Sequence, residues 1–214
     1  MLTMIQLHQE VQQRLGWSNG KYSSEGRGAG KTAVVLGAGP VGILGAMALV
    51  VQGFKTFVYS RSAEPNPKAD LINSIGAKYV SAVTTSCADF AKIAGHIDLV
   101  YEAVGVASIT FDVLKILGLN GVFVFTGIPP VKPAIPIEAD TLMRQMVLMN
   151  QAIIGTVNAD RPAFENAIRD LVTFKQRWPE ALRAVITGRF PMTSYRELLL
   201  GGATGIKNVI TIGE

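Results

Sequence analysis

Three glycines at a fixed spacing have the clearest chemical use in this 214-residue sequence. Gly37, Gly39 and Gly42 form a G-x-G-x-x-G motif directly after an apolar run and directly before a second one. In such a motif the first glycine permits a tight turn, the second lets backbone approach a pyrophosphate, and the third lets a helix pack close to a strand. Pro40 and Val41 begin that helix, whose free N–H groups and positive dipole end favour a phosphate. The motif predicts a dinucleotide-binding turn, the alternative being a glycine-rich turn without a ligand.

The next candidate site follows the second strand-like run, about 20 residues after the glycines. At this place an NAD-binding site carries an acidic residue that accepts a hydrogen bond from the ribose 2′-hydroxyl. The sequence here reads Ser60-Arg61-Ser62. A guanidinium can pair with a 2′-phosphate through two parallel hydrogen bonds. The pattern therefore predicts that the cofactor is NADP. NAD is the alternative if Glu64 reaches the ribose, and Arg61 could also be a solvated surface arginine that binds no cofactor.

Two other segments imitate functional motifs. Residues 25–32 end in Gly-Lys-Thr like a P-loop, but they precede a strand-like run instead of following one, so we reject a P-loop. Residues 33–51 carry no charge over 19 positions, yet four glycines and Pro40 interrupt them. A buried strand followed by a buried helix has the same hydropathy, so we predict no membrane span.

Composition excludes further classes. The chain has 20 basic and 16 acidic residues without a basic run, so we expect no nucleic-acid partner. Its one cysteine, Cys87, allows no intrachain disulfide and favours a reducing, cytoplasmic setting.

Short β-branched runs alternate with helix-like runs, which is typical of βαβ units on a parallel sheet. Strands are predicted over 32–36, 55–60, 78–81, 97–101, 121–126 and 153–157, and helices over 41–51, 67–75, 86–93, 109–117 and 141–150. The fold class is therefore α/β, a doubly wound (Rossmann) sheet with strand order 3-2-1-4-5-6.

The two ends of the chain differ from this pattern. Residues 1–31 are polar and glycine-rich, and we expect a lead-in with a helix over 5–15 before a dinucleotide-binding domain over 32–214. Near the C-terminus, a helix is expected to begin at Arg161-Pro162 and to be interrupted at Pro179. A final strand is predicted over 208–212.

Several segments together resemble a known family. Residues 34–42, 98–105 and 121–127 resemble the cofactor domain of medium-chain, zinc-type alcohol dehydrogenases. Ile154-Gly155-Thr156-Val157-Asn158-Ala159, Phe164, Trp178-Pro179-Glu180-Ala181 and Ile206-Lys207-Asn208-Val209 resemble the C-terminal domain of the glucose dehydrogenases of that superfamily. The resemblance covers residue 30 to the end. It implies an NADP-binding domain of an enzyme that transfers hydride from an alcohol carbon, such as the anomeric carbon of an aldose, to the nicotinamide.

The resemblance also implies roles for single residues. The matching family positions contact the cofactor at Thr126, Gly127, Ile128, Thr156, Val157, Asn158 and Lys207, and the asparagine also reaches the sugar. Each has a structural alternative: the threonines could end strands, Asn158 could cap the following helix, and Lys207 could be a solvated charge. Glu102 matches an acidic family position, as a hydrogen-bonding group or as a ligand.

The family holds its catalytic zinc on a separate N-terminal domain. The soft ligands of this chain are Cys87, His8 and His96, which the sequence spaces far apart, so we expect no zinc site in it. We interpret the chain as lacking that domain, through truncation or as a separate chain, and expect the isolated chain to be inactive. A stand-alone nucleotide-binding module or redox sensor is the alternative; a short-chain dehydrogenase is disfavoured because no tyrosine has lysine four residues on.

The resemblance finally predicts assembly. Enzymes of this superfamily join cofactor-domain sheets edge to edge, which protects an exposed strand from open-ended pairing. The predicted sixth strand, near residues 152–156, is apolar and a candidate edge. We expect a homo-oligomer, a dimer or a tetramer.

Overall fold

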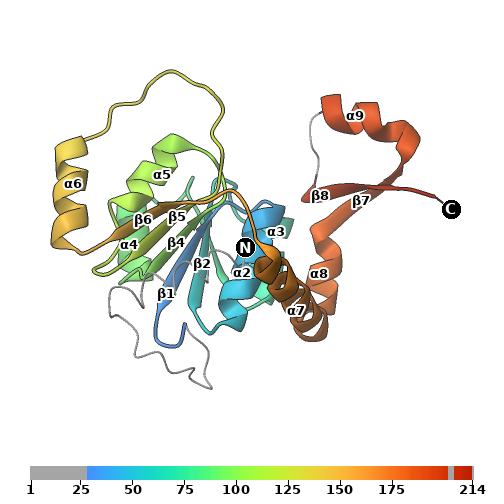
Figure 1. Ribbon diagram of the computed structural model, residues 1–214, viewed down its shortest axis with the longest axis horizontal. Coiled ribbons are helices and arrows are strands. Elements are labelled where there is room, and N and C mark those ends of the chain that lie inside the picture. Colours follow the sequence, from blue (N-terminus) through green and yellow to red (C-terminus); the bar gives the residue numbers. More distant parts are fainter. Residues whose placement is uncertain (1–27, 202–204, 214) are drawn as a thin grey trace.

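A computed structural model describes residues 28–201 and 205–213, so the expected helix over 5–15 lies outside the described residues. A six-stranded parallel sheet of order β3-β2-β1-β4-β5-β6 forms the centre (Figure 1). The predicted fold class and strand order are confirmed. The strands are β1 (Thr32–Leu36), β2 (Lys55–Ser60), β3 (Lys78–Ser81), β4 (Leu99–Glu102), β5 (Val122–Phe125) and β6 (Ala152–Gly155).

Helices cover both faces of the sheet, as parallel sheets require. On one face lie α2 (Pro40–Val51), α3 (Pro67–Ser74), α7 (Arg161–Arg177) and α8 (Pro179–Val185). On the other lie α4 (Cys87–Ala94), α5 (Ala107–Leu114) and α6 (Ala139–Leu148) (Figure 1). The helix break predicted at Pro179 is the boundary between α7 and α8, where Pro179 takes the first helical position.

The uncharged stretch 33–51 is the centre of the core. Every residue of β1 is buried between the two helix layers, and most of α2 is buried against the sheet. Burial on all sides explains why this stretch carries no charge. In the part of the chain that the structure describes, no helix has the length and hydropathy to cross a bilayer.

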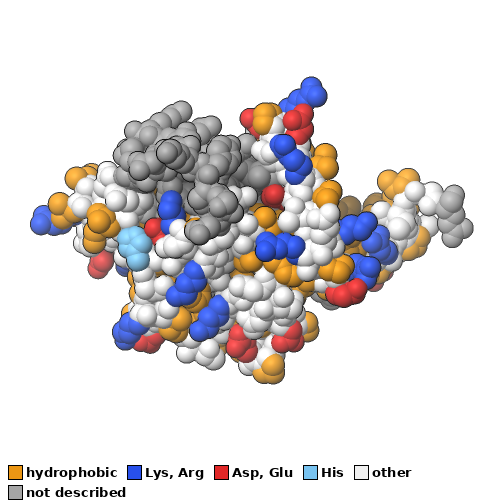
Figure 2. All heavy atoms as spheres, turned by 90° about the horizontal axis from the view of Figure 1, so that it is seen from below, with side chains coloured by type: hydrophobic (Ala, Val, Ile, Leu, Met, Phe, Trp, Pro, Cys, Tyr) orange, Lys and Arg blue, Asp and Glu red, His pale blue; other side chains and the backbone are white. Residues whose placement is uncertain are grey.

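The C-terminal part forms a separate unit. After α8 come β7 (Ile186–Pro191), a short 3₁₀ turn (Met192–Ser194), α9 (Tyr195–Leu200) and β8 (Lys207–Thr211). β7 and β8 pair in parallel with each other, outside the main sheet, and this unit projects from the body of the molecule (Figure 2). The sequence predicted β8 and missed β7, because glycine and proline within Ile186–Pro191 are typical of a loop.

Parallel strands bring their following loops to one edge of the sheet. The chain runs outward from β1 to β3 and then returns to β4 beside β1, so the strand order reverses between β1 and β4. In open α/β sheets, ligands bind outside the carboxyl ends of the strands at this point. The predicted site residues after β1, β2, β5 and β6 therefore lie along one edge.

Candidate functional site

The glycine turn joins β1 to α2 at the reversal point. Gly37 has a φ of +99°, a conformation that side chains rarely adopt, and its N–H donates to the Tyr59 carbonyl at 3.0 Å. A Cβ on Gly42 would overlap the carbonyl oxygen of Gly37, whereas a Cβ on Gly39 would meet no atom within 4 Å. The first and third glycines are thus required by the fold itself. Gly39 instead leaves open space beside the backbone.

The helix that follows this turn has no side-chain cap. Gly39 is the N-cap of α2 and offers no acceptor. By contrast, Asn66, Ser86 and Asp160 cap α3, α4 and α7 with side-chain oxygens that accept backbone N–H bonds. The exposed Val41 and the half-buried Pro40 stand in the first turn of α2. Its N-terminus therefore presents N–H groups to the open space that Gly39 leaves.

The residues predicted to bind the 2′-phosphate lie at the end of β2, at the same edge of the sheet. Ser60 is the last residue of β2, and its carbonyl accepts from Ala82 N–H at 2.8 Å. The Ser62 carbonyl accepts from the Tyr79 hydroxyl at 2.7 Å. Arg61 lies between these two anchored residues with its side chain exposed. The backbone of this loop is held while the guanidinium faces solvent, an arrangement suited to an anion from outside.

The loops after β5 and β6 carry the residues that the resemblance singled out. Thr126 directly follows β5, and its hydroxyl donates to the Glu102 carbonyl at 2.7 Å. Thr156 N–H continues the ladder to the Phe125 carbonyl at 3.0 Å. The cap of α7 is Asp160, whose carboxylate accepts from Ala163 N–H, and the capping alternative for Asn158 is wrong. Ile128, Val157 and Asn158 are exposed at the edge.

Glu102 is the candidate residue whose role the sequence left open. It is buried at the end of β4 and accepts backbone hydrogen bonds from Val104, Gly105 and Gly127. These contacts favour its hydrogen-bonding role. Its one sequence signal is a charge at the end of an otherwise apolar strand.

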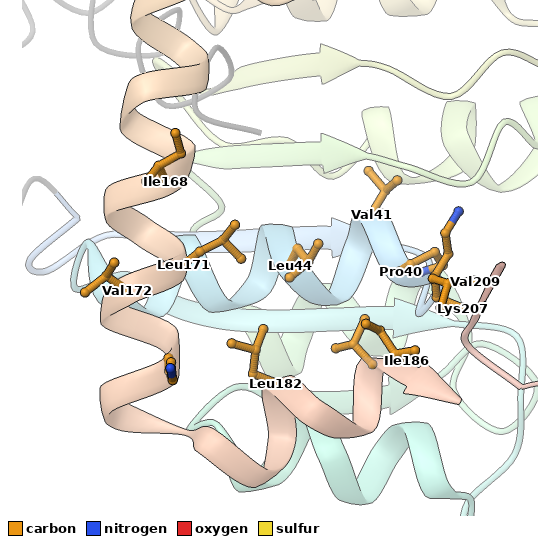
Figure 3. A pocket seen from close by; sticks show the side chains of 12 residues that line it. Pro40, Val41, Leu44, Ile168, Leu171, Val172, Leu182, Ile186, Lys207 and Val209 are labelled. Carbon is orange, nitrogen blue, oxygen red and sulfur yellow. The ribbon is translucent and has the colours of Figure 1, made fainter. Parts of the chain in front are cut away.

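Lys207, near the C-terminal end of the chain, lies close to the glycine turn in space. It lines an apolar pocket of about 700 Å³ together with Pro40 and Val41, between α2, α7 and α8 (Figure 3). In this view Lys207 of β8 lies beside Pro40, at the beginning of α2. Of the predicted site residues, the lining of this pocket includes Pro40, Val41 and Lys207.

The residues that the structure describes do not fit a zinc ion. Across residues 28–201 and 205–213, no group of three His, Cys, Asp or Glu side chains could hold a metal. The Cys87 thiol is half-buried and donates to the Asp112 carbonyl, and burial raises its pKa to about 11, which disfavours the thiolate that binds metals. His96 pairs with Asp98 instead, at 3.5 Å. His8 lies outside the described residues.

Comparisons with known proteins agree with this geometry. Residues 20–212 match the family described as glucose dehydrogenase C-terminus. A glucose 1-dehydrogenase of Methanocella arvoryzae is 28% identical over 183 residues, covering 86% of this chain and 51% of that protein. Glucose 1-dehydrogenase 2 of Vulcanisaeta moutnovskia is 34% identical over 185 residues, covering 85% and 50%. The chain thus spans about half the length of the curated relatives it matches.

A solved structure supports the same relation. Glucose dehydrogenase of Haloferax mediterranei, in complex with NADP, Zn and gluconolactone, superposes with a TM-score of 0.76 at 28% identity. The match covers 96% of this chain and 56% of that one. Because the family match extends over most of the chain, from residue 20 to residue 212, the chain belongs to the family of glucose dehydrogenase C-terminal domains.

Proposed function

We propose that this chain binds NADP(H) along the carboxyl edge of its sheet. The pyrophosphate would lie on Gly37, Gly39 and the uncapped N-terminus of α2, where open space and free N–H groups coincide. The 2′-phosphate would lie on Ser60, Arg61 and Ser62. The observation that carries this proposal is the exposed guanidinium on an anchored loop at the end of β2, next to the uncapped turn. The NADP complex of the Haloferax relative supports it.

The nicotinamide half would then follow the edge past β4 toward β5 and β6. We assign Thr126, Gly127, Ile128, Thr156, Val157 and Asn158 to its contacts, and Lys207 to the cofactor beside Pro40. The exposed positions of Ile128, Val157 and Asn158 at this edge support the assignment. Asn158 is free of the capping role, because Asp160 fills it, and its amide would also contact the sugar.

We infer that the activity served is that of a sugar or alcohol dehydrogenase. Bound NADP supplies the hydride acceptor, and the residues of this chain bind and orient it. The glucose 1-dehydrogenases of Methanocella arvoryzae and Vulcanisaeta moutnovskia to which the chain is similar support glucose or a similar aldose as the substrate.

We further propose that the chain forms a homo-oligomer through the β6 edge of its sheet. β6 is the last strand of the sheet, and the neighbouring helix α6 exposes Met143, Val147 and Leu148. Hydrophobic side chains gather at this end of the molecule (Figure 2). A partner that covered this end would bury these side chains and satisfy the outer backbone groups of β6.

Calorimetric titration of the 214-residue chain with NADPH and with NADH tests the cofactor proposal. Charge-assisted hydrogen bonds to the 2′-phosphate are worth about 1.5–3 kcal/mol. We therefore expect NADPH to bind at least about tenfold more tightly than NADH. Equal affinities, or tighter binding of NADH, would contradict the assignment of Arg61.

A further inference from the structure

Glu102 brings two loops of the cofactor edge together through one buried carboxylate. Its side chain is 1% exposed at the end of β4. Oε1 accepts from the N–H groups of Val104 and Gly105, at 2.7 and 2.6 Å. Oε2 accepts from the N–H of Gly127, at 2.9 Å. One carboxylate thus joins loop 103–105, which follows β4, to loop 126–128, which follows β5.

The two loops approach so closely because both carry glycine. A Cβ on Gly127 would overlap the Gly105 nitrogen and lie 2.7 Å from Glu102 Oε2. Gly105 has a φ of +62°, and a Cβ there would lie 3.0 Å from the Ile128 carbonyl oxygen. Side chains at either position would separate the loops. The glycines and the carboxylate therefore form one arrangement, which we call the Glu102 clamp: Glu102, Gly105 and Gly127.

Only a carboxylate serves all three donors. An ionised carboxylate accepts on both oxygens, whereas an amide has one accepting oxygen and one donating NH₂ group. A buried charge is costly unless hydrogen bonds compensate it, and here three backbone N–H groups do so. The main chain of the same residue adds support, since the Glu102 carbonyl accepts from the Thr126 N–H and hydroxyl.

The clamp lies at the reversal point of the sheet. A Cβ on Gly37 would lie 3.3 Å from Val104 Cβ and 3.4 Å from the Ala103 carbonyl oxygen, so loop 103–105 packs against the phosphate-binding turn. Loop 126–128 continues from it toward the region assigned to the nicotinamide. The position of both loops relative to the turn therefore depends on Glu102.

We propose that Glu102 is a positioning residue that holds loops 103–105 and 126–128 in the arrangement that receives the nicotinamide half of the cofactor. It touches no cofactor atom itself, and it acts through the backbone of Val104, Gly105 and Gly127. This inference rests on the proposed NADP site. It predicts that Glu102 affects the intact dinucleotide more than the half that carries the 2′-phosphate.

The variant Glu102→Gln tests the clamp in the full chain. We expect NADPH to bind at least about tenfold more weakly than it binds to wild type. The NH₂ group of the glutamine cannot accept a hydrogen bond, so it would face a backbone N–H of one of the two loops and release that loop. Adenosine 2′,5′-bisphosphate, which reaches only the end of β2 and the glycine turn, should keep its affinity within about twofold. A merely structural defect would weaken both ligands, so the ratio of the two effects identifies positioning.

Asp98→Asn is the matched control. Asp98 immediately precedes β4, at the end of the strand opposite to Glu102, and its carboxylate accepts from Thr32 N–H at 2.8 Å. Its replacement by asparagine removes the same charge. We expect its NADPH affinity to stay within about twofold of wild type. Equal NADPH affinities of wild type and Glu102→Gln would overturn the proposal that Glu102 is a positioning residue and would leave the proposed NADP site standing. A wild-type chain that bound neither ligand would contradict the proposed function instead.

Hydrogen exchange of the unliganded wild-type chain tests the clamp without a variant. Val104 is 42% exposed, and its amide would exchange rapidly if its N–H were open to water. The clamp predicts protection of the Val104, Gly105 and Gly127 amides well above that of the neighbouring exposed loop residues. Exchange of these amides at the rate of an open loop would overturn the proposal, even if Glu102→Gln did not fold.

Discussion

Arg61 is the residue on which we expect cofactor choice to depend. Its neighbours are anchored: Ser60 through its carbonyl to Ala82, and Ser62 through its carbonyl to the Tyr79 hydroxyl. The loop backbone is thus ordered before a ligand arrives, and binding orders little more than the arginine side chain. Glu64, the acid that would serve NAD, follows two positions after Ser62 and is exposed.

Arg61→Ala should weaken NADPH binding about tenfold to a hundredfold and leave NADH binding nearly unchanged, because only NADPH carries the phosphate. Ser60→Asp combined with Arg61→Ala should invert the preference, since aspartate accepts from the free 2′-hydroxyl. Calorimetric titration of both variants with both cofactors measures the effect. Arg144→Ala, an exposed arginine on α6, is the charge-matched control. An Arg61→Ala chain that kept its NADPH preference would place the phosphate elsewhere.

Within the unit formed by β1, the glycine turn and α2, Gly42 and Gly39 have different roles. Gly42 has no space for a methyl group, because a Cβ would overlap the Gly37 carbonyl oxygen. Gly39 has that space, and its φ of −80° is open to any residue. One glycine therefore holds the unit together, and the other keeps a surface clear for the pyrophosphate.

Gly39→Ala and Gly42→Ala should consequently fail in different ways. Gly39→Ala should change the free energy of unfolding by less than about 1 kcal/mol. It should weaken NADPH binding at least about tenfold, because its methyl group would occupy the approach to the backbone. Gly42→Ala should lower the free energy of unfolding by about 1–3 kcal/mol, through overpacking. Urea denaturation and calorimetric titration of each variant give both quantities. Equal loss of stability in the two variants would contradict this division.

In the whole molecule, the two edges of the sheet are unlike. At one edge of the sheet, strand β3 is followed by a turn that contains the exposed Val83. At the other edge, β6 lies beside α6, whose Met143 and Val147 are 64% and 79% exposed. Val147 and Met143 stand one turn apart on the same side of α6. An apolar stripe next to the edge strand of a sheet is the kind of surface that a second copy of the chain would cover.

Val147→Glu should shift the chain from oligomer to monomer in light scattering over a concentration series, because a buried and unpaired charge opposes association. Val83→Glu adds the same charge at the opposite edge and should leave the oligomer intact. If wild type is a monomer at every concentration, or if both variants dissociate equally, the β6 edge is not the interface.

Features that depend on nearby residues could be predicted from the sequence. The bounds of β1, β2 and β3 match the prediction residue for residue, since each is an apolar or β-branched run that ends in turn chemistry. The bounds of β4, β5, β6 and β8 differ from the prediction by one or two residues at each end, the usual uncertainty of element boundaries. The glycine turn was predictable because its motif carries strand, turn and helix in consecutive positions.

The remaining features depend on which distant segments the fold brings into contact. The role of Glu102 required its partner Gly127, 25 residues away on the next strand's loop. Lys207 lies beside Pro40 only because β8 pairs with β7 and returns to α2, and β7 itself has too little alternation to be predicted alone. Hydrophobic period and turn residues thus determine the elements and the phosphate turn. Contacts between particular loop residues depend on how the loops pack against one another in the folded chain, which no local pattern in the sequence specifies.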